Sequence, residues 1–269
     1  MNDDMLPDPD TLTEALAGTR WTTIEVVPET GSTNADLMAR TRPPAELDGT
    51  VRIAGRQTSG RGRHTRVWQT PRGQLAVSAA VAVGPGRAES LGWLSLLTGL
   101  AVRRAIGETT GAAVDLKWPN DILAPEDGPG GGRKTSGILS EFRPAGEGGL
   151  AVIGTGLNLD LTQADPPIET AACLRGITGV VVDPTTLTAA YLRALSDLLA
   201  SWPDGIGGLA AEYRAASATL GREVRLILPG DDEVIGTAVD VDDQGRIVVD
   251  GDRGRVTASA GDVTHLRLR

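Results

Sequence analysis

The chain has 269 residues, of which 40% are apolar, and a formal net charge of −9. This composition is typical of a globular protein with a packed core, and it excludes the fibrous and fully disordered classes. The acidic balance argues against general nucleic-acid binding, because affinity for a phosphate backbone depends on clustered positive charge.

The single cysteine, Cys173, excludes an internal disulfide framework, and two histidines are too few for a Cys/His metal cluster. The acidic, proline-containing start does not resemble a secretory signal. No apolar run approaches the length of about 20 residues that a membrane-spanning helix needs. We therefore expect a cytoplasmic protein with no membrane partner.

Residues 1–20 contain one weak helical pattern and are expected to form an N-terminal extension. A strand is predicted over 21–27, and Ser32 and Thr33 stand at the start of the helical pattern that follows. Thr33 and Asp36 resemble a capping box. Free backbone N–H groups at such a helix start can hold a polar ligand group, although ordinary capping explains the same residues without a ligand.

Segment 49–88 contains seven arginines and no Asp or Glu. Its centre, Gly60-Arg61-Gly62-Arg63, alternates glycines, which let a ligand approach the backbone, with guanidinium groups that bind carboxylate or phosphate. Such a loop can wrap a small anion and become ordered when the anion binds. A solvated basic turn or a nucleic-acid contact would give the same local pattern. Trp68, which ends the loop, suits either core packing or stacking on a flat ring.

The middle of the chain predicts a strand over 74–83, a buried helix over 89–107, and a strand that delivers Lys117 and Trp118 to a Pro-Asn-Asp turn. A flexible connection at 124–132 precedes a strand predicted over 134–141. Lys117 and Lys134 are the only lysines among 26 basic residues. Arginine does not replace the compact ammonium group geometrically, so we interpret both positions as candidate functional residues.

A further strand is predicted over 150–157, where Gly154-Thr155-Gly156 superficially resembles a dinucleotide fingerprint. Leu159 at the third glycine position, with no helix after it, excludes that interpretation. A polar loop over 161–172 precedes helices predicted over 185–200 and 209–218. Beyond residue 220, short strands over 223–228, 234–241, 246–249, 255–258 and 264–268 predict a small closed SH3-like barrel. The expected regions are therefore 1–20, 21–220 and 221–269.

Five motifs occur in one order: GSTNADL, QTSGRGRHTRVW, KWPND, KTSGILSE and GTGLNLD. In this order and spacing they resemble those of the biotin–protein ligases (biotin–[acetyl-CoA-carboxylase] ligases), from about residue 21 to the C-terminus. The resemblance implies an α+β fold, with a mixed sheet flanked by helices as in class II aminoacyl-tRNA synthetases and a C-terminal SH3-like domain. It also implies that biotin and ATP form biotinyl-5′-AMP, with Mg²⁺ expected and its ligands unknown, and that biotin then passes to a carrier lysine.

The same resemblance implies roles for individual residues. The implied catalytic residues are Arg63, Lys117, Asp121 and Lys134. The implied biotin-binding residues are Ser32, Thr33, Asn34, Gln57, Gly60, Arg61, Gly62, Arg63, Lys134 and Gly137. The implied ATP- and adenylate-binding residues are Arg63, Trp68, Lys117, Asn120, Lys134, Gly156 and Asn158, with loop 161–172 on the nucleotide side.

Two departures from the family pattern are Thr65, where the family often has glycine, and the polar pair Thr135-Ser136 after Lys134. The implied partner is the biotin carboxyl carrier domain of acyl-CoA carboxylases, and the implied state is a monomer or weak homodimer. The short N-terminal region leaves no room for the DNA-binding domain of family repressors, so no DNA partner is expected. The alternatives are a lipoate or octanoate ligase and a non-catalytic nucleic-acid-binding regulator.

Overall fold

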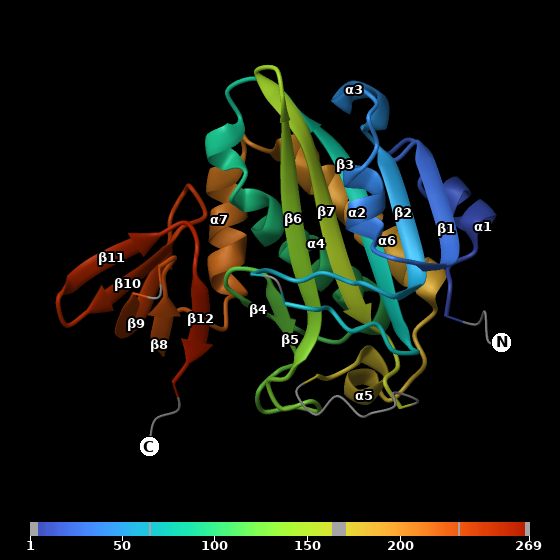
Figure 1. Cartoon of the computed structure of the whole chain (residues 1–269). Helices are drawn as coiled ribbons and strands as arrows, with labels where there is room; N and C mark the ends of the chain where they lie inside the picture. The colour runs from blue at the N-terminus through green and yellow to red at the C-terminus, as the bar shows by residue number, and fades with distance from the viewer. Residues whose placement is uncertain (1–4, 65, 163–170, 231, 267–269) are drawn as a thin grey trace.

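The computed structural model describes residues 5–64, 66–162, 171–230 and 232–266, and these build two sheets (Figure 1). The larger sheet has seven strands in the order β1 (Thr23–Thr30), β2 (Thr50–Gln57), β3 (Gln74–Val83), β7 (Gly148–Asn158), β6 (Lys134–Ala145), β5 (Asp121–Leu123) and β4 (Asp115–Lys117). β1 and β2 are parallel, and the other neighbours are antiparallel. The predicted mixed sheet is thus confirmed.

Helices cover both faces of this sheet (Figure 1). One face packs on the long helices α4 (Trp93–Thr110) and α6 (Pro184–Ser201), with α1 (Pro9–Ala15) beside α6 and α7 (Ile206–Ala215) beside α4. The other face carries the short helices α2 (Thr33–Met38) and α3 (Pro44–Leu47), which contact β3 and β7. The central strand β3 consists mainly of small and β-branched residues, and almost all of its residues are buried, as a strand covered on both faces requires.

Most predicted elements are present, with shifted ends. The predicted helix 89–107 is a 3₁₀ turn, Ala88–Ser90, followed by α4, whose first residue Trp93 donates its indole N–H to the Asp243 carbonyl oxygen at 2.8 Å. The short helices α3 and α5 (Leu174–Thr178) were not predicted, because four or five residues carry too little periodicity.

The predicted capping box of Thr33 and Asp36 is wrong. Ser32 is the N-cap, and its hydroxyl accepts from the Ala35 amide at 3.4 Å. Asp36 accepts hydrogen bonds from Arg52 at 2.7 Å and from the Thr30 hydroxyl at 2.6 Å. The neighbouring strand β2 therefore offers Asp36 a charged donor, and a hydrogen bond from a guanidinium group is stronger than one from a backbone amide.

The smaller sheet has five antiparallel strands in the order β11 (Gly254–Ala258), β10 (Ile247–Gly251), β9 (Glu233–Val241), β8 (Glu223–Ile227) and β12 (Asp262–His265). These five strands form the small C-terminal β domain that was predicted, and within the ranges described no ladder joins β11 to β12. Residues 267 and 268 of the last predicted strand lie outside those ranges. Trp118 donates its indole N–H to the Gly245 carbonyl oxygen at 3.0 Å, which fixes this sheet beside β4.

Candidate active site

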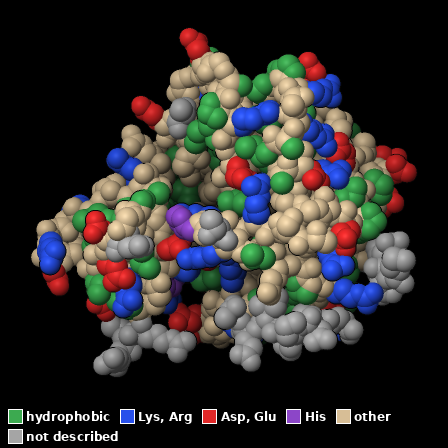
Figure 2. Space-filling model, viewed as in Figure 1, with side chains coloured by type: hydrophobic (Ala, Val, Ile, Leu, Met, Phe, Trp, Pro, Cys, Tyr) green, Lys and Arg blue, Asp and Glu red, His purple; other side chains and the backbone are tan. Residues whose placement is uncertain are grey.

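A cavity of about 460 Å³ opens between the larger sheet, the arginine-rich loop of residues 60–69 and the edge of the smaller sheet. Every residue that the motifs assigned to the site lines this cavity, except Gly60. Gly60 lies at the base of the loop, where its carbonyl oxygen accepts from the Trp68 amide at 3.0 Å. Figure 2 shows Lys and Arg side chains gathered over the middle of this face, although the protein as a whole is acidic.

One end of the cavity is a corner of neutral polar groups at the start of α2. Gln57 Oε1 accepts from the Thr33 amide at 2.9 Å and from the Thr33 hydroxyl at 3.2 Å. Ser78 Oγ lies 2.7 Å from Thr33 Oγ1 and 2.6 Å from Asn34 Oδ1. Motif analysis missed Ser78, which is fully buried in β3 and stands in a run of small apolar residues. The corner is organised before a ligand arrives, because its side chains hold one another in place.

Asn34 also contacts β6 and β7. Its amide donates to Glu141 Oε2 at 2.8 Å and to the Leu139 carbonyl oxygen at 3.1 Å. A Cβ added at Gly154 would lie 2.2 Å from Asn34 Oδ1, so only glycine gives this side chain room. Glu141 accepts from Arg61 as well, at 3.0 Å, and it too was missed although it stands inside a recognised motif.

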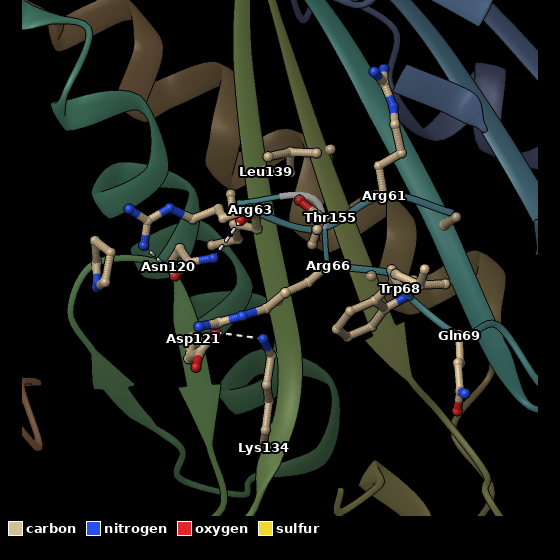
Figure 3. Close-up of a pocket in the computed structure, with 18 of the residues that line it drawn as sticks. Arg61, Arg63, Arg66, Trp68, Gln69, Asn120, Asp121, Lys134, Leu139 and Thr155 are labelled. Atoms are coloured by element: carbon tan, nitrogen blue, oxygen red, sulfur yellow. Dashed lines mark hydrogen bonds and ion pairs between the residues drawn. The ribbon is translucent and has the colours of Figure 1, made fainter. Parts of the chain in front are cut away.

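The second end of the cavity is lined by the two lysines, of which Lys134 is seen beside Asp121 in Figure 3. Lys134 Nζ lies 2.5 Å from Asp121 Oδ1, and Lys117 Nζ lies 3.8 Å from Asp121 Oδ2. The Lys134 ammonium is also 5.2 Å from the centroid of the Trp68 ring, within the range of a cation–π contact. Two cations therefore share one carboxylate, which leaves net positive charge facing the cavity.

Trp68 lies flat against two glycines of the sheet. A Cβ at Gly156 would come within 2.4 Å of the indole ring, and one at Gly137 within 2.9 Å. Three buried polar atoms around this ring have no hydrogen-bond partner within the described residues: Trp68 Nε1, Gln74 Oε1 and Asn158 Oδ1. Unpaired buried donors and acceptors cost free energy, so these atoms suit a polar ligand that enters the cavity.

Two arginines of the loop, Arg63 and Arg66, extend toward Asn120 and Asp121, whereas Arg61 points away from them (Figure 3). Arg63 Nη1 lies 3.4 Å from Asn120 Oδ1 and 3.4 Å from Asp262 Oδ1, which belongs to the smaller sheet. Burial lowers the pKa of Arg63 from its ordinary value, and the carboxylates of Asp262 and Asp121 oppose that change. The guanidinium group stays charged in a partly dehydrated place, where its attraction for an anion is stronger than in water.

Two predicted features of the site fall partly or wholly outside the described residues. Thr65 is outside them. Of the nucleotide-side loop 161–172, residues 163–170 are outside them, and Ala171 lines the cavity. Taken together, the described side chains combine neutral polar groups, a flat aromatic ring and convergent cations. Such a set can bring a carboxylate and a nucleotide phosphate together, because fixed cations offset the repulsion between the two anions.

Residues 26–158 match the sequence model of the Biotin/lipoate A/B protein ligase family, and residues 219–266 match that of the Biotin protein ligase C terminal domain. The chain is 43% identical to Biotin–[acetyl-CoA-carboxylase] ligase of Mycobacterium tuberculosis over 256 residues, covering 93% of this chain and 92% of that protein. It is 30% identical to the Bifunctional ligase/repressor BirA of Escherichia coli, covering 85% of this chain and 70% of that protein. Biotin protein ligase from Aquifex aeolicus, solved with biotin and ATP, superposes with a TM-score of 0.77 at 27% identity, covering 92% of this chain and 100% of that one.

Proposed function

This chain belongs to the Biotin/lipoate A/B protein ligase family as an ATP-dependent biotin protein ligase, and we propose that the cavity described above is where it joins biotin to AMP. The observation that supports this site most directly is that residues from five separate motifs line a single cavity. The 43% identity to a biotin–[acetyl-CoA-carboxylase] ligase over 93% of the chain favours biotin over lipoate as the acid.

Biotin would bind in the polar corner. Ser32, Thr33, Asn34 and Gln57 supply donors and acceptors that suit a neutral ureido ring, and all of them line the cavity. The biotin carboxylate would then point toward the cationic end, where Lys134 and Arg63 lie. This orientation puts the neutral ring among neutral groups and the anion among cations.

ATP would take the opposite side, with its adenine near Trp68 and Asn158. The carboxylate oxygen of biotin attacks the α-phosphorus, the bond to the β-phosphate oxygen breaks, and pyrophosphate leaves. Lys134, Lys117 and Arg63 stabilise the charge that gathers on the phosphoryl oxygens, and Asp121 holds the two lysines in place. Asn120 supports Arg63 from the KWPND turn at 3.4 Å.

In the second step, an uncharged carrier lysine attacks the acyl carbon of biotinyl-5′-AMP. An amide bond forms, the bond to the AMP oxygen breaks, and the lysine gives up a proton. We propose a biotin carboxyl carrier domain of an acyl-CoA carboxylase as the protein acceptor, without DNA as a partner. The acceptor in the name of the Mycobacterium tuberculosis relative, acetyl-CoA carboxylase, supports this choice. We further propose that the enzyme is cytoplasmic and acts as a monomer or a weak homodimer. Among the described helices, none has the length and apolar character to cross a bilayer.

Mg²⁺ would enter mainly with the triphosphate. No three His, Cys, Asp or Glu side chains gather to hold a metal in the ranges that the structure describes. The carboxylate nearest the cationic end, Asp121, is already shared by two lysines. The ion would screen the charge of the triphosphate. The phosphate oxygens would be its main ligands, and protein side chains would add few direct contacts.

A reconstituted reaction tests this proposal. Purified chain, biotin, ATP, Mg²⁺ and a biotin carboxyl carrier domain should release pyrophosphate and AMP, and mass spectrometry should show one biotin on the carrier. Excess lipoate should not compete. Carrier labelling by lipoate in place of biotin would support the lipoate ligase alternative, and absence of any adenylate with either acid would refute the proposal.

A further inference from the structure

The arginine-rich loop is a hairpin with its own internal hydrogen bonds. Arg61 and Val67 form an antiparallel bridge, and the Gly62 amide donates to the Arg66 carbonyl oxygen at 2.7 Å. The Trp68 amide closes the base on the Gly60 carbonyl oxygen at 3.0 Å. A hairpin tied in this way moves as one piece, so contacts at its tip control where all its arginines lie.

The hairpin touches carboxylates on both sheets. Arg61 reaches Glu141 of β6 at 3.0 Å. On the other side, Arg66 forms a close ion pair with Asp262 Oδ2, and Arg63 lies 3.4 Å from Asp262 Oδ1. Arg63 also donates to the Gly261 carbonyl oxygen at 3.1 Å. The loop therefore spans the cavity from the larger sheet to the first residue of β12.

Asp262 is well placed to hold the loop. Its side chain is 22% exposed, and the side chain of Arg63 is 20% exposed, so solvent and salt screen this contact less than a fully exposed pair. Its two carboxylate oxygens face two different guanidinium groups. One carboxylate cannot neutralise both cations, and the remaining positive charge stays available to an anionic ligand.

We propose that Asp262 is a positioning residue of the ligase: through Arg66 it fastens the arginine hairpin to the smaller sheet, and thereby holds Arg63 over the cavity. The effect of this contact on the reaction rests on the proposed function, because the expected effect is on the retention of biotinyl-5′-AMP. An acyl-adenylate is lost to water when its site opens, so a fastened hairpin lengthens the time for which the intermediate stays bound. The contact itself does not depend on the identity of the substrate.

The test uses the full chain with Asp262→Asn, Arg66→Gln and the double variant. The matched control is Asp250→Asn, which breaks an Asp–Arg pair with Arg255 on the same sheet. Hydrogen–deuterium exchange of the segment 57–68 is measured without ligand. We expect Asp262→Asn to speed exchange about 1.5-fold to fivefold, the range for loss of a partly exposed ion pair. Asp250→Asn should leave exchange in this segment unchanged.

The second measurement is the rate at which bound biotinyl-5′-AMP dissociates. Asp262→Asn and Arg66→Gln should each speed it by about 1.5-fold to fivefold. The double variant should exceed Asp262→Asn by little, because both substitutions remove the same Arg66–Asp262 contact. Asp262→Glu, which keeps a carboxylate, should recover part of the retention.

Unchanged exchange in Asp262→Asn, or an equal rise in Asp250→Asn, would overturn the proposal. So would fully additive effects of the two single variants on dissociation. If no variant and no wild-type protein formed biotinyl-5′-AMP, the proposed function would fail, and the exchange experiment would still decide whether Asp262 fastens the hairpin.

Discussion

Lys134 Nζ lies 2.5 Å from Asp121 Oδ1, and this pair joins neighbouring strands of the larger sheet at the floor of the cavity. The Lys134 ammonium group is held by the Asp121 carboxylate on one side and by the Trp68 ring on another, with 5.2 Å between Nζ and the ring centroid. Its charge is therefore fixed in place before a substrate binds. Charge that needs no reorganisation during the reaction is the most effective kind for stabilising a transition state.

Lys134→Ala should lower the rate of adenylate formation by about 100- to 1,000-fold, the range for removing one preorganised stabilising group. Lys134→Arg should recover little, because a planar guanidinium group does not fit where a compact ammonium group pairs with Asp121. Biotin-dependent exchange between pyrophosphate and ATP measures this step without a carrier. Arg253→Ala, which removes a cation from an exposed turn of the smaller sheet, serves as the control. A rate for Lys134→Ala within threefold of wild type would contradict the assignment.

Gly156→Ala should weaken nucleotide binding. The new methyl group would lie 2.4 Å from the Trp68 ring, which must move away from the sheet. Overpacking of this kind costs about 1–3 kcal/mol, so the KM for ATP should rise roughly 5- to 150-fold while biotin affinity changes less. Titration with ATP and with biotin separately measures both.

Gly207→Ala is the control for Gly156→Ala. No atom lies within 4 Å of its added Cβ, and the residue is inside α7. It should leave both affinities unchanged and stabilise the fold by about 0.5–1 kcal/mol, because alanine suits a helix better than glycine. Equal ATP affinity in Gly156→Ala and wild type would show that Trp68 does not contact the nucleotide.

The sequence allowed the strands, the long helices and most of the cavity lining to be predicted, because these follow from local pattern and from recognisable motifs. It did not allow Asp262 to be found. Asp262 stands 196 residues from Arg66, in a segment whose local pattern indicates only a short strand. Contacts between distant segments depend on how the two sheets pack, and no periodicity within either segment reports that packing.

Ser78 and Arg66 were missed for different reasons. Ser78 is one hydroxyl in a strand of small residues, and local sequence does not distinguish it from a serine that only packs in the core. The structure places it beside Thr33 and Asn34. Arg66 is inside the recognised loop, but the motif did not distinguish it from its neighbours. Evenly spaced short strands allowed the small C-terminal β domain to be predicted, but this spacing does not specify the strand order β11-β10-β9-β8-β12.

Ser78→Ala should weaken biotin binding more than it slows the chemical step. The change removes a hydroxyl that lies within hydrogen-bond distance of both Thr33 Oγ1 and Asn34 Oδ1, and it leaves both buried groups with one partner fewer. Such a loss costs about 1–3 kcal/mol, so the Kd for biotin should rise roughly 5- to 150-fold. Calorimetric titration measures it, alongside kcat at saturating biotin.

Ser196→Ala is the control for Ser78→Ala. Ser196 accepts a hydrogen bond from the Arg20 amide at 3.2 Å, outside the cavity. It should change biotin affinity by less than about twofold, as expected for a distant site that shares no partner with the ligand. A biotin Kd in Ser78→Ala that matches this control would mean that the polar corner does not receive biotin.

His265 should make the contact between the two sheets sensitive to acid. The Trp118 amide donates to Thr219 Oγ1 at 3.2 Å, so the Thr219 hydroxyl proton is free to be donated to His265 Nε2, 3.1 Å away. When the His265 ring is neutral with its own proton on Nδ1, Nε2 can accept the hydrogen bond from the Thr219 hydroxyl. Burial, reinforced by the nearby charges of Lys117 and Arg222, lowers the pKa of His265 from 6.5 to about 4.

Because the folded pKa of His265 is depressed, the unfolded chain takes up the proton first as the pH falls. The stabilising contribution is complete above about pH 6.5, declines as the pH falls toward about 4, and is gone below that value. His265→Gln keeps an acceptor for Thr219 but cannot titrate, so its deficit in unfolding free energy relative to wild type should shrink between pH 7 and pH 4.5. Urea unfolding at several pH values measures the difference in unfolding free energy between the two proteins. His64 and the carboxylates are present in both proteins, so their contributions cancel in this difference. A deficit that stays constant across this range would show that His265 is not held neutral by the fold, and that the hydrogen bond from Thr219 does not depend on its protonation.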